Sequence, residues 1–130
     1  MISLKEQMKK VNQTYDNWSG SIKGQNQLIL KGRVQPTIIS PSYEIEVKYQ
    51  LFRNPEVRVI SPKLKMRADK RELPHVNSDG TLCLDFKRIN PNIDLIAETF
   101  IVWITWWLYY YEIWYETGKW VARGTHPDRW

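Results

Sequence analysis

The spacing of hydrophobic and polar positions changes along the chain, and its first segment has the period of a helix. Apolar residues in 3–18 recur every three or four positions, which predicts an amphipathic helix with one apolar stripe. Ser3 followed by Glu6 has the pattern of a capping box at its start. Gly20 is the predicted stop.

A period of two follows, which is typical of half-buried strands. Residues 43–53 alternate between apolar and polar side chains, and residues 26–34 are predicted as the strand before them. A third short strand begins near Val57, after the turn signal of Asn54-Pro55. Three strands joined by short links predict an antiparallel meander.

Residues 94–117 have the pattern of one long helix, with Asp94 as its N-cap and Gly118 as its C-terminal stop. The run 99–111 (TFIVWITWWLYYY) is apolar on more than one face, so the helix is expected to be buried on most sides or to contact a partner. The run is shorter than the roughly 20 residues of a membrane span, so a core helix is predicted.

Composition predicts one α+β domain over residues 1–130, because the chain has an ordinary length and 42% apolar residues. A single cysteine excludes an internal disulfide, and the N-terminal segment lacks the apolar core of a signal peptide. We therefore expect a cytoplasmic protein. With one cysteine and two histidines we expect no metal, and we expect no organic cofactor.

Regular patterning fades between residues 61 and 91, where prolines and Gly80 interrupt the chain. Irregular stretches of this length in a small domain are typical of functional loops. The segment 73–85 (LPHVNSDGTLCLD) contains the cysteine, Cys83, and an apolar stretch from Leu82 to Phe86 that we expect to contact the rest of the domain.

This segment resembles the active-site loop of the ubiquitin-conjugating enzymes. The residues that match are Pro74, Asn77, Gly80, Thr81, Leu82, Cys83, Leu84 and Asp85. Two positions depart from the family: Leu73 replaces its histidine, and His75 replaces its asparagine. The order of predicted elements is also similar: an N-terminal helix, an antiparallel meander, an active-site loop and a long aromatic C-terminal helix.

The short form that ends after one long helix, the histidine at residue 75 and the segment 111–120 (YEIWYETGKW) of the tryptophan-rich C-terminal region resemble bacterial relatives encoded in anti-phage operons of the CBASS type. The resemblance implies that Cys83 is a catalytic cysteine that carries an acyl group as a thioester. It implies a protein partner, the C-terminal tail of a nucleotidyltransferase that makes cyclic oligonucleotides or of a ubiquitin-like protein. A separate activating enzyme would supply ATP-dependent activation, if one is used.

His75 is the second candidate catalytic residue, and three roles are open for it: donor to an oxyanion, base for the nucleophile, or hydrogen-bond partner within the loop. Asn77 and Asp79 are expected to shape the turn, and Gly80 to supply a backbone conformation that other residues avoid. Cationic residues near the thiol in sequence could favour its thiolate, namely Lys70, Arg71, Lys87 and Arg88. Asp85 and His126 are expected to be solvated rather than catalytic.

Three other functions compete with this one. A non-catalytic adaptor of the same fold is favoured by the missing asparagine but not by the presence of Cys83. A cysteine hydrolase could use Cys83 and His75, although no third residue that would orient the histidine is recognisable. The net charge of +5 suggests an acidic partner, yet the aromatic residues follow a helix pattern rather than a strand platform, so nucleic-acid binding is not expected.

Overall fold

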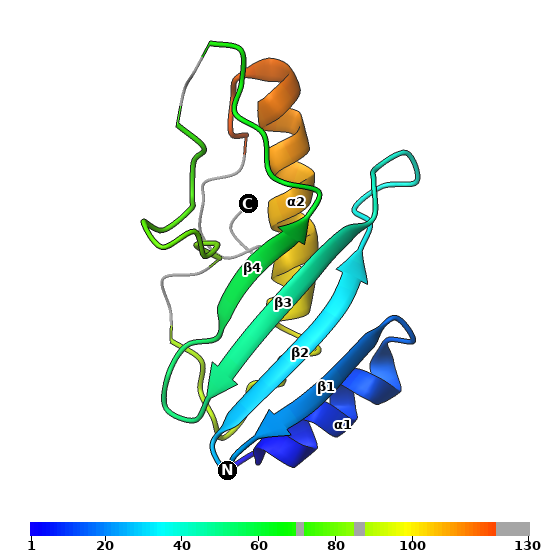
Figure 1. Ribbon diagram of the computed structural model, residues 1–130, viewed down its shortest axis with the longest axis vertical. Helices are drawn as coiled ribbons and strands as arrows, with labels where there is room; N and C mark the ends of the chain where they lie inside the picture. Colours follow the sequence, from blue (N-terminus) through cyan, green and yellow to red (C-terminus); the bar gives the residue numbers. More distant parts are fainter. Residues whose placement is uncertain (70–71, 85–87, 122–130) are drawn as a thin grey trace.

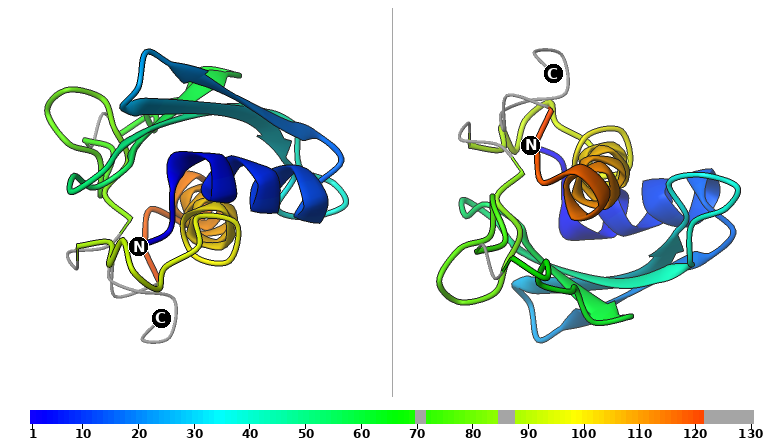
Figure 2. Two further views of the ribbon diagram at one scale, coloured as in Figure 1. Left: turned by 90° about the horizontal axis from the view of Figure 1, so that it is seen from below. Right: turned by 90° about the horizontal axis from the view of Figure 1, so that it is seen from above.

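One layer of the protein is a four-stranded antiparallel sheet, and the other layer is made by two helices. The computed structural model describes residues 1–69, 72–84 and 88–121. The elements in chain order are α1 (Leu4–Thr14), β1 (Trp18–Lys23), β2 (Gln27–Val34), β3 (Tyr43–Gln50), β4 (Glu56–Ser61) and α2 (Phe100–Thr117). The strands are neighbours in sequence order, and both helices lie on the concave face of the curved sheet (Figure 1, Figure 2). The α+β class is therefore confirmed.

Helix α1 begins where the capping box predicts it. The Ser3 side chain accepts a hydrogen bond from the Glu6 backbone, and the Glu6 carboxylate accepts one from the Ser3 backbone, both at 3.1 Å. The predicted end at residue 18 is wrong, because the helix stops at Thr14 and Trp18 starts strand β1.

The sheet has one strand more than the three that were predicted. Strand β1 pairs with β2 so that Trp18 lies opposite Gly32, where an added Cβ would overlap the indole ring. The alternation in β3 is confirmed, since its odd-numbered residues from 43 to 49 are buried. This strand ends at Gln50 rather than at residue 53, because the chain turns at Phe52, whose φ is +69°.

Helix α2 begins later than predicted, at Phe100, because residues 91–93 and 96–99 form turns. The prediction of Asp94 as the N-cap is wrong: its carboxylate accepts a hydrogen bond from the backbone N–H of Asn90 at 2.7 Å and so closes the preceding turn. Gly118 ends the helix in the left-handed conformation, as expected. In the described part of the chain, no helix combines the length and apolar character that a membrane crossing requires.

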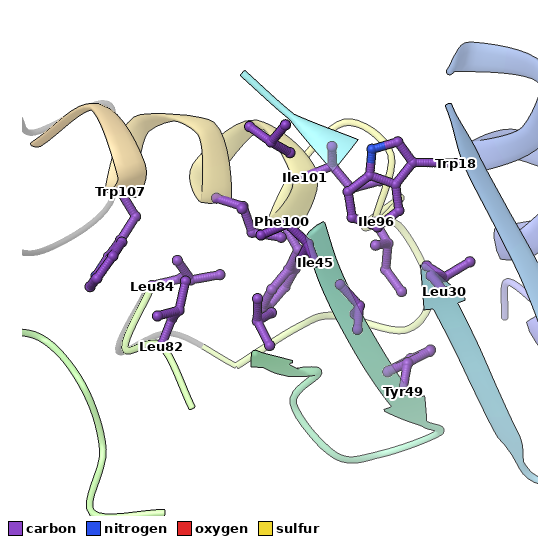
Figure 3. Close-up of a cluster of buried hydrophobic side chains, with 14 of the residues drawn as sticks. Trp18, Leu30, Ile45, Tyr49, Leu82, Leu84, Ile96, Phe100, Ile101 and Trp107 are labelled. Carbon is purple, nitrogen blue, oxygen red and sulfur yellow. The ribbon is translucent and has the colours of Figure 1, made fainter. Parts of the chain in front are cut away.

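The hydrophobic core lies between the sheet and α2. Figure 3 shows Ile45 of β3 in the same cluster as Phe100 and Trp107 of α2. Leu82 and Leu84 belong to this cluster and are 6% and 3% exposed. The predicted contact of this stretch with the domain is confirmed for residues 82–84, whereas Asp85 and Phe86 lie outside the described residues.

A buried glutamine joins α1 to the segment before α2. Gln7 is fully buried; its Nε2 donates to the carbonyl of Asp94 at 2.8 Å, and its Oε1 accepts from the N–H of Ile96 at 2.9 Å. These two hydrogen bonds satisfy backbone groups of a segment that belongs to neither a strand nor a helix.

We expect Gln7→Leu to lower the free energy of unfolding by about 2 to 4 kcal/mol, because it leaves both backbone groups without partners. Urea denaturation of the two proteins measures the difference. The control is Gln13→Leu on the exposed side of the same helix, with an expected change within about 0.5 kcal/mol. Equal effects of the two substitutions would contradict the bridging role of Gln7.

Candidate functional site

Cys83 lies on a narrow hairpin. Val76 and Leu82 form an antiparallel bridge, and the N–H of Cys83 donates to the carbonyl of His75 at 2.9 Å. The N–H of Leu82 also donates to the carbonyl of Val57 at 2.9 Å, which joins the hairpin to β4. The position of the thiol is therefore set by backbone bonds on two sides.

Polar side chains close the turn of this hairpin. The carboxylate of Asp79 accepts hydrogen bonds from the backbone and the hydroxyl of Thr81, at 3.0 and 2.6 Å, and these bonds lower the pKa of Asp79. The carboxamide Nδ2 of Asn77 donates to the same hydroxyl oxygen at 3.0 Å. Gly80 has a φ of +87°. Asn77, Asp79 and Gly80 thus shape the turn as expected.

Cys83 is half-buried and lines a small cavity of about 150 Å³. Two asparagines also line this cavity, Asn77 from the hairpin and Asn54 from the link between β3 and β4. The remaining lining residues are apolar: Pro55, Leu82, Leu84 and Phe100. The residues that share this cavity with Cys83 are therefore two asparagines and four apolar residues.

His75 is close to Cys83 through its backbone, but its ring has other neighbours. The ring centroid lies 4.9 Å from that of Trp120, and His75 does not line the cavity of Cys83. Its φ is +56°, and its carbonyl accepts a second hydrogen bond from Nε1 of Trp107 at 3.2 Å. Burial lowers the pKa of the imidazole, which favours the neutral form near pH 7.

Trp120 belongs to the segment that carries the resemblance, but the sequence patterns did not predict its contacts in this region. Its ring lies 5.4 Å from that of Trp107 and 6.2 Å from that of Tyr110, both on α2. It thereby covers His75 from the side of the C-terminal segment. The segment after Gly118 has no periodic pattern, and only the size of the side chain could have indicated that Trp120 is partly buried against the core.

Most of the charged residues near Cys83 in sequence, and the second histidine, lie outside the described residues. They are Lys70, Arg71, Asp85, Lys87 and His126. Arg88 is described and is exposed. Among the residues that the structure describes, no group of three or more histidine, cysteine, aspartate or glutamate side chains could hold a metal ion.

A larger hollow of about 680 Å³ lies beside the C-terminal half of α2 and the link between β2 and β3. The carboxylate of Glu112 at its wall accepts hydrogen bonds from the hydroxyls of Ser40 and Tyr43, each at 2.7 Å. Burial and the neighbouring carboxylate raise the pKa of Tyr43, so this phenol stays protonated. None of the residues that line this hollow also lines the cavity at Cys83.

The comparison with protein families identifies the class of protein. Residues 7–127 match the family described as Type II CBASS E2 protein. Because this match spans most of the chain, the protein belongs to that family, and the predicted relationship to the CBASS conjugating enzymes is confirmed. The family supports an E2-like role in CBASS defence, alongside other CBASS proteins. No curated protein shows significant similarity to the chain.

The lowered pKa of His75 predicts a pH dependence of stability. The unfolded chain binds a proton near the ordinary histidine pKa of about 6.5, whereas the folded protein binds it only at lower pH. The free energy of unfolding should therefore fall as the pH is lowered from about 7 through this range.

The substitution His75→Asn removes this titration while tolerating the positive φ, so the pH dependence of its stability should be flatter below about pH 7. Urea denaturation of both proteins at several pH values measures the two slopes. The other histidine, His126, is present in both proteins and does not affect the difference. Equal slopes would contradict the shifted pKa.

Proposed function

We propose that this protein is a conjugating enzyme of a CBASS system that carries a protein C-terminus as a thioester on Cys83. Its chain would form one ubiquitin-conjugating-enzyme-like domain over residues 1–130. The observation that supports this function best is the position of the thiol. Cys83 is half-buried and lines a small cavity at the hairpin, so it is more accessible than its neighbours Leu82 and Leu84, which are 6% and 3% exposed.

The proposed reaction needs two acyl transfers. In the first, the Cys83 thiolate attacks an activated carbonyl and releases its leaving group. In the second, an acceptor nucleophile attacks the thioester and releases the thiolate. Both steps pass through a tetrahedral oxyanion, which a hydrogen-bond donor would stabilise. A partly accessible cysteine at a small cavity that two asparagines also line suits both transfers.

The partner that we propose is the C-terminal tail of a nucleotidyltransferase that makes cyclic oligonucleotides, or of a ubiquitin-like protein. The family supports the first, because CBASS proteins act together. A narrow cavity of about 150 Å³ admits the end of a flexible tail but not a folded domain. Activation of the tail by ATP would take place on a separate enzyme.

For His75 we propose the third of its open roles, that of a residue that stabilises the loop. Its ring contacts Trp120, and its carbonyl accepts hydrogen bonds from Cys83 and Trp107. A cysteine hydrolase would need the imidazole at the cavity of the thiol to take up its proton. The absence of His75 from the residues that line this cavity therefore favours the transferase over the hydrolase.

We expect Cys83→Ser to trap the acyl partner as an oxyester, because an alkoxide is a poorer leaving group than a thiolate. The experiment is intact-mass analysis after co-expression with the nucleotidyltransferase and other proteins of the same operon. The wild-type protein should gain an adduct that thiol reagents release, and the serine variant an adduct that resists them.

The matched control is Cys83→Ala, which has no nucleophile and should gain no adduct of either kind. Thermal unfolding of the three proteins verifies that each is folded. An adduct that persists in the alanine variant would overturn the assignment of Cys83 as the acyl carrier. Lack of any adduct on folded wild-type protein would favour the adaptor of the same fold.

A further inference from the structure

We propose that the carboxamide of Asn54 donates the hydrogen bond that stabilises the oxyanion at Cys83. This inference rests on the proposed function and assigns a further catalytic residue to the same site. Asn54 belongs to the link between β3 and β4, far in sequence from the hairpin that carries the thiol. It nevertheless lines the same small cavity as Cys83.

The orientation of the Asn54 carboxamide is set by one backbone group. The N–H of Ile89 donates to Oδ1 of Asn54 at 2.7 Å. A backbone N–H can pair only with the oxygen of a carboxamide, so this bond also identifies which end of the group is the NH2. Within the described residues, no acceptor contacts this NH2, which leaves both of its protons available to an acyl oxygen.

The other candidate donors at the site are more constrained. Asn77 lines the cavity as well, but its Nδ2 already donates to the hydroxyl of Thr81 at 3.0 Å. The imidazole of His75 contacts Trp120 and does not line the cavity. Asn54 is therefore the carboxamide whose donor group is both fixed in orientation and uncommitted.

The proposed role of Asn54 is to stabilise the tetrahedral intermediate that forms when the thioester reacts with an amine. The nitrogen of an acceptor amine forms a bond to the thioester carbon, and the carbonyl π electrons move to oxygen. The Asn54 NH2 donates to this oxyanion. The oxyanion then re-forms the carbonyl, the carbon–sulfur bond breaks, and the proton lost by the amine ends on the Cys83 thiolate or in solvent. The products are an amide and the free thiol.

The assignment also accounts for the replacement at residue 75. The resemblance places the family's asparagine at this position, where the present chain has His75 with its ring against Trp120. A carboxamide from the neighbouring β3–β4 link would supply the same chemical group to the same oxygen. The donor would then come from a different element of the fold.

The experiment compares Asn54→Ala with the wild type in a reaction that needs no partner protein. A short synthetic peptide thioester of mercaptoethanesulfonate that ends in glycine loads Cys83 by thiol exchange. Hydroxylamine then discharges the enzyme, and intact mass follows the rate in a single turnover. Loss of one oxyanion donor should slow discharge about 100-fold.

A second measurement separates this role from a structural one. Alkylation of Cys83 by iodoacetamide forms no oxyanion, so its rate should stay within about threefold of wild type in Asn54→Ala. Asn54→Asp keeps the acceptor for the Ile89 N–H but lacks the donor. The ratio of its discharge rate to its alkylation rate should therefore remain below that of the wild type. The control Asn12→Ala, an exposed asparagine of α1, should discharge at the wild-type rate.

Each outcome decides the question. Discharge of Asn54→Ala at the wild-type rate would overturn the assignment. So would a parallel loss of discharge and alkylation, which would indicate a structural role. A larger loss of discharge in His75→Ala than in Asn54→Ala, with normal alkylation, would assign the donor to the histidine instead. Failure of the wild type itself to load would instead contradict the proposed thioester function, and this assignment with it.

Discussion

The burial of the two leucines that flank Cys83 determines where the thiol lies. In an extended segment, alternate side chains point to opposite sides, so Leu82 and Leu84 can be buried in the core while Cys83 between them stays half-buried. Burial of each leucine stabilises this arrangement by roughly 1.5 to 3 kcal/mol. Movement of the Cys83 backbone would have to expose them, so the site is positioned by the core and not by the loop alone.

Helix α2 is the element around which the loops assemble. Its aromatic residues contact the core through their rings and use their polar atoms to bind backbone groups of irregular segments. Nε1 of Trp107 donates to the carbonyl of His75, and the hydroxyl of Tyr111 accepts from the N–H of Lys65 at 2.8 Å. Arg67 donates to the carbonyls of Trp114 and Tyr115 at the end of the helix, at 3.0 and 2.6 Å. The many tryptophans and tyrosines thus hold segments that have no strand partner.

The errors in the predicted elements have a common physical cause. Trp18 continues the apolar spacing of α1, but its indole fits only over Gly32 of the neighbouring strand, so it belongs to β1. Asp94 has the chemistry of an N-cap, but it closes a separate turn whose other backbone groups bind Gln7. At both positions a residue far away in the chain, Gly32 or Gln7, contacts the segment, and no local pattern contains that residue; the Asp94 carboxylate itself pairs with the nearby Asn90.

Local patterns by themselves determined the start of α1, the face of β3 that is buried, the end of α2 at Gly118 and the loop that carries Cys83. Each depends on residues only a few positions apart, so short-range spacing is sufficient to predict it. Only the tertiary structure decided which groups surround the thiol. Asn54 lies at the cavity because β4 binds the hairpin through Val57. The ring of His75 lies against that of Trp120 because both residues contact Trp107 of α2. These neighbouring residues come from separate elements. They come together only when the sheet packs against α2.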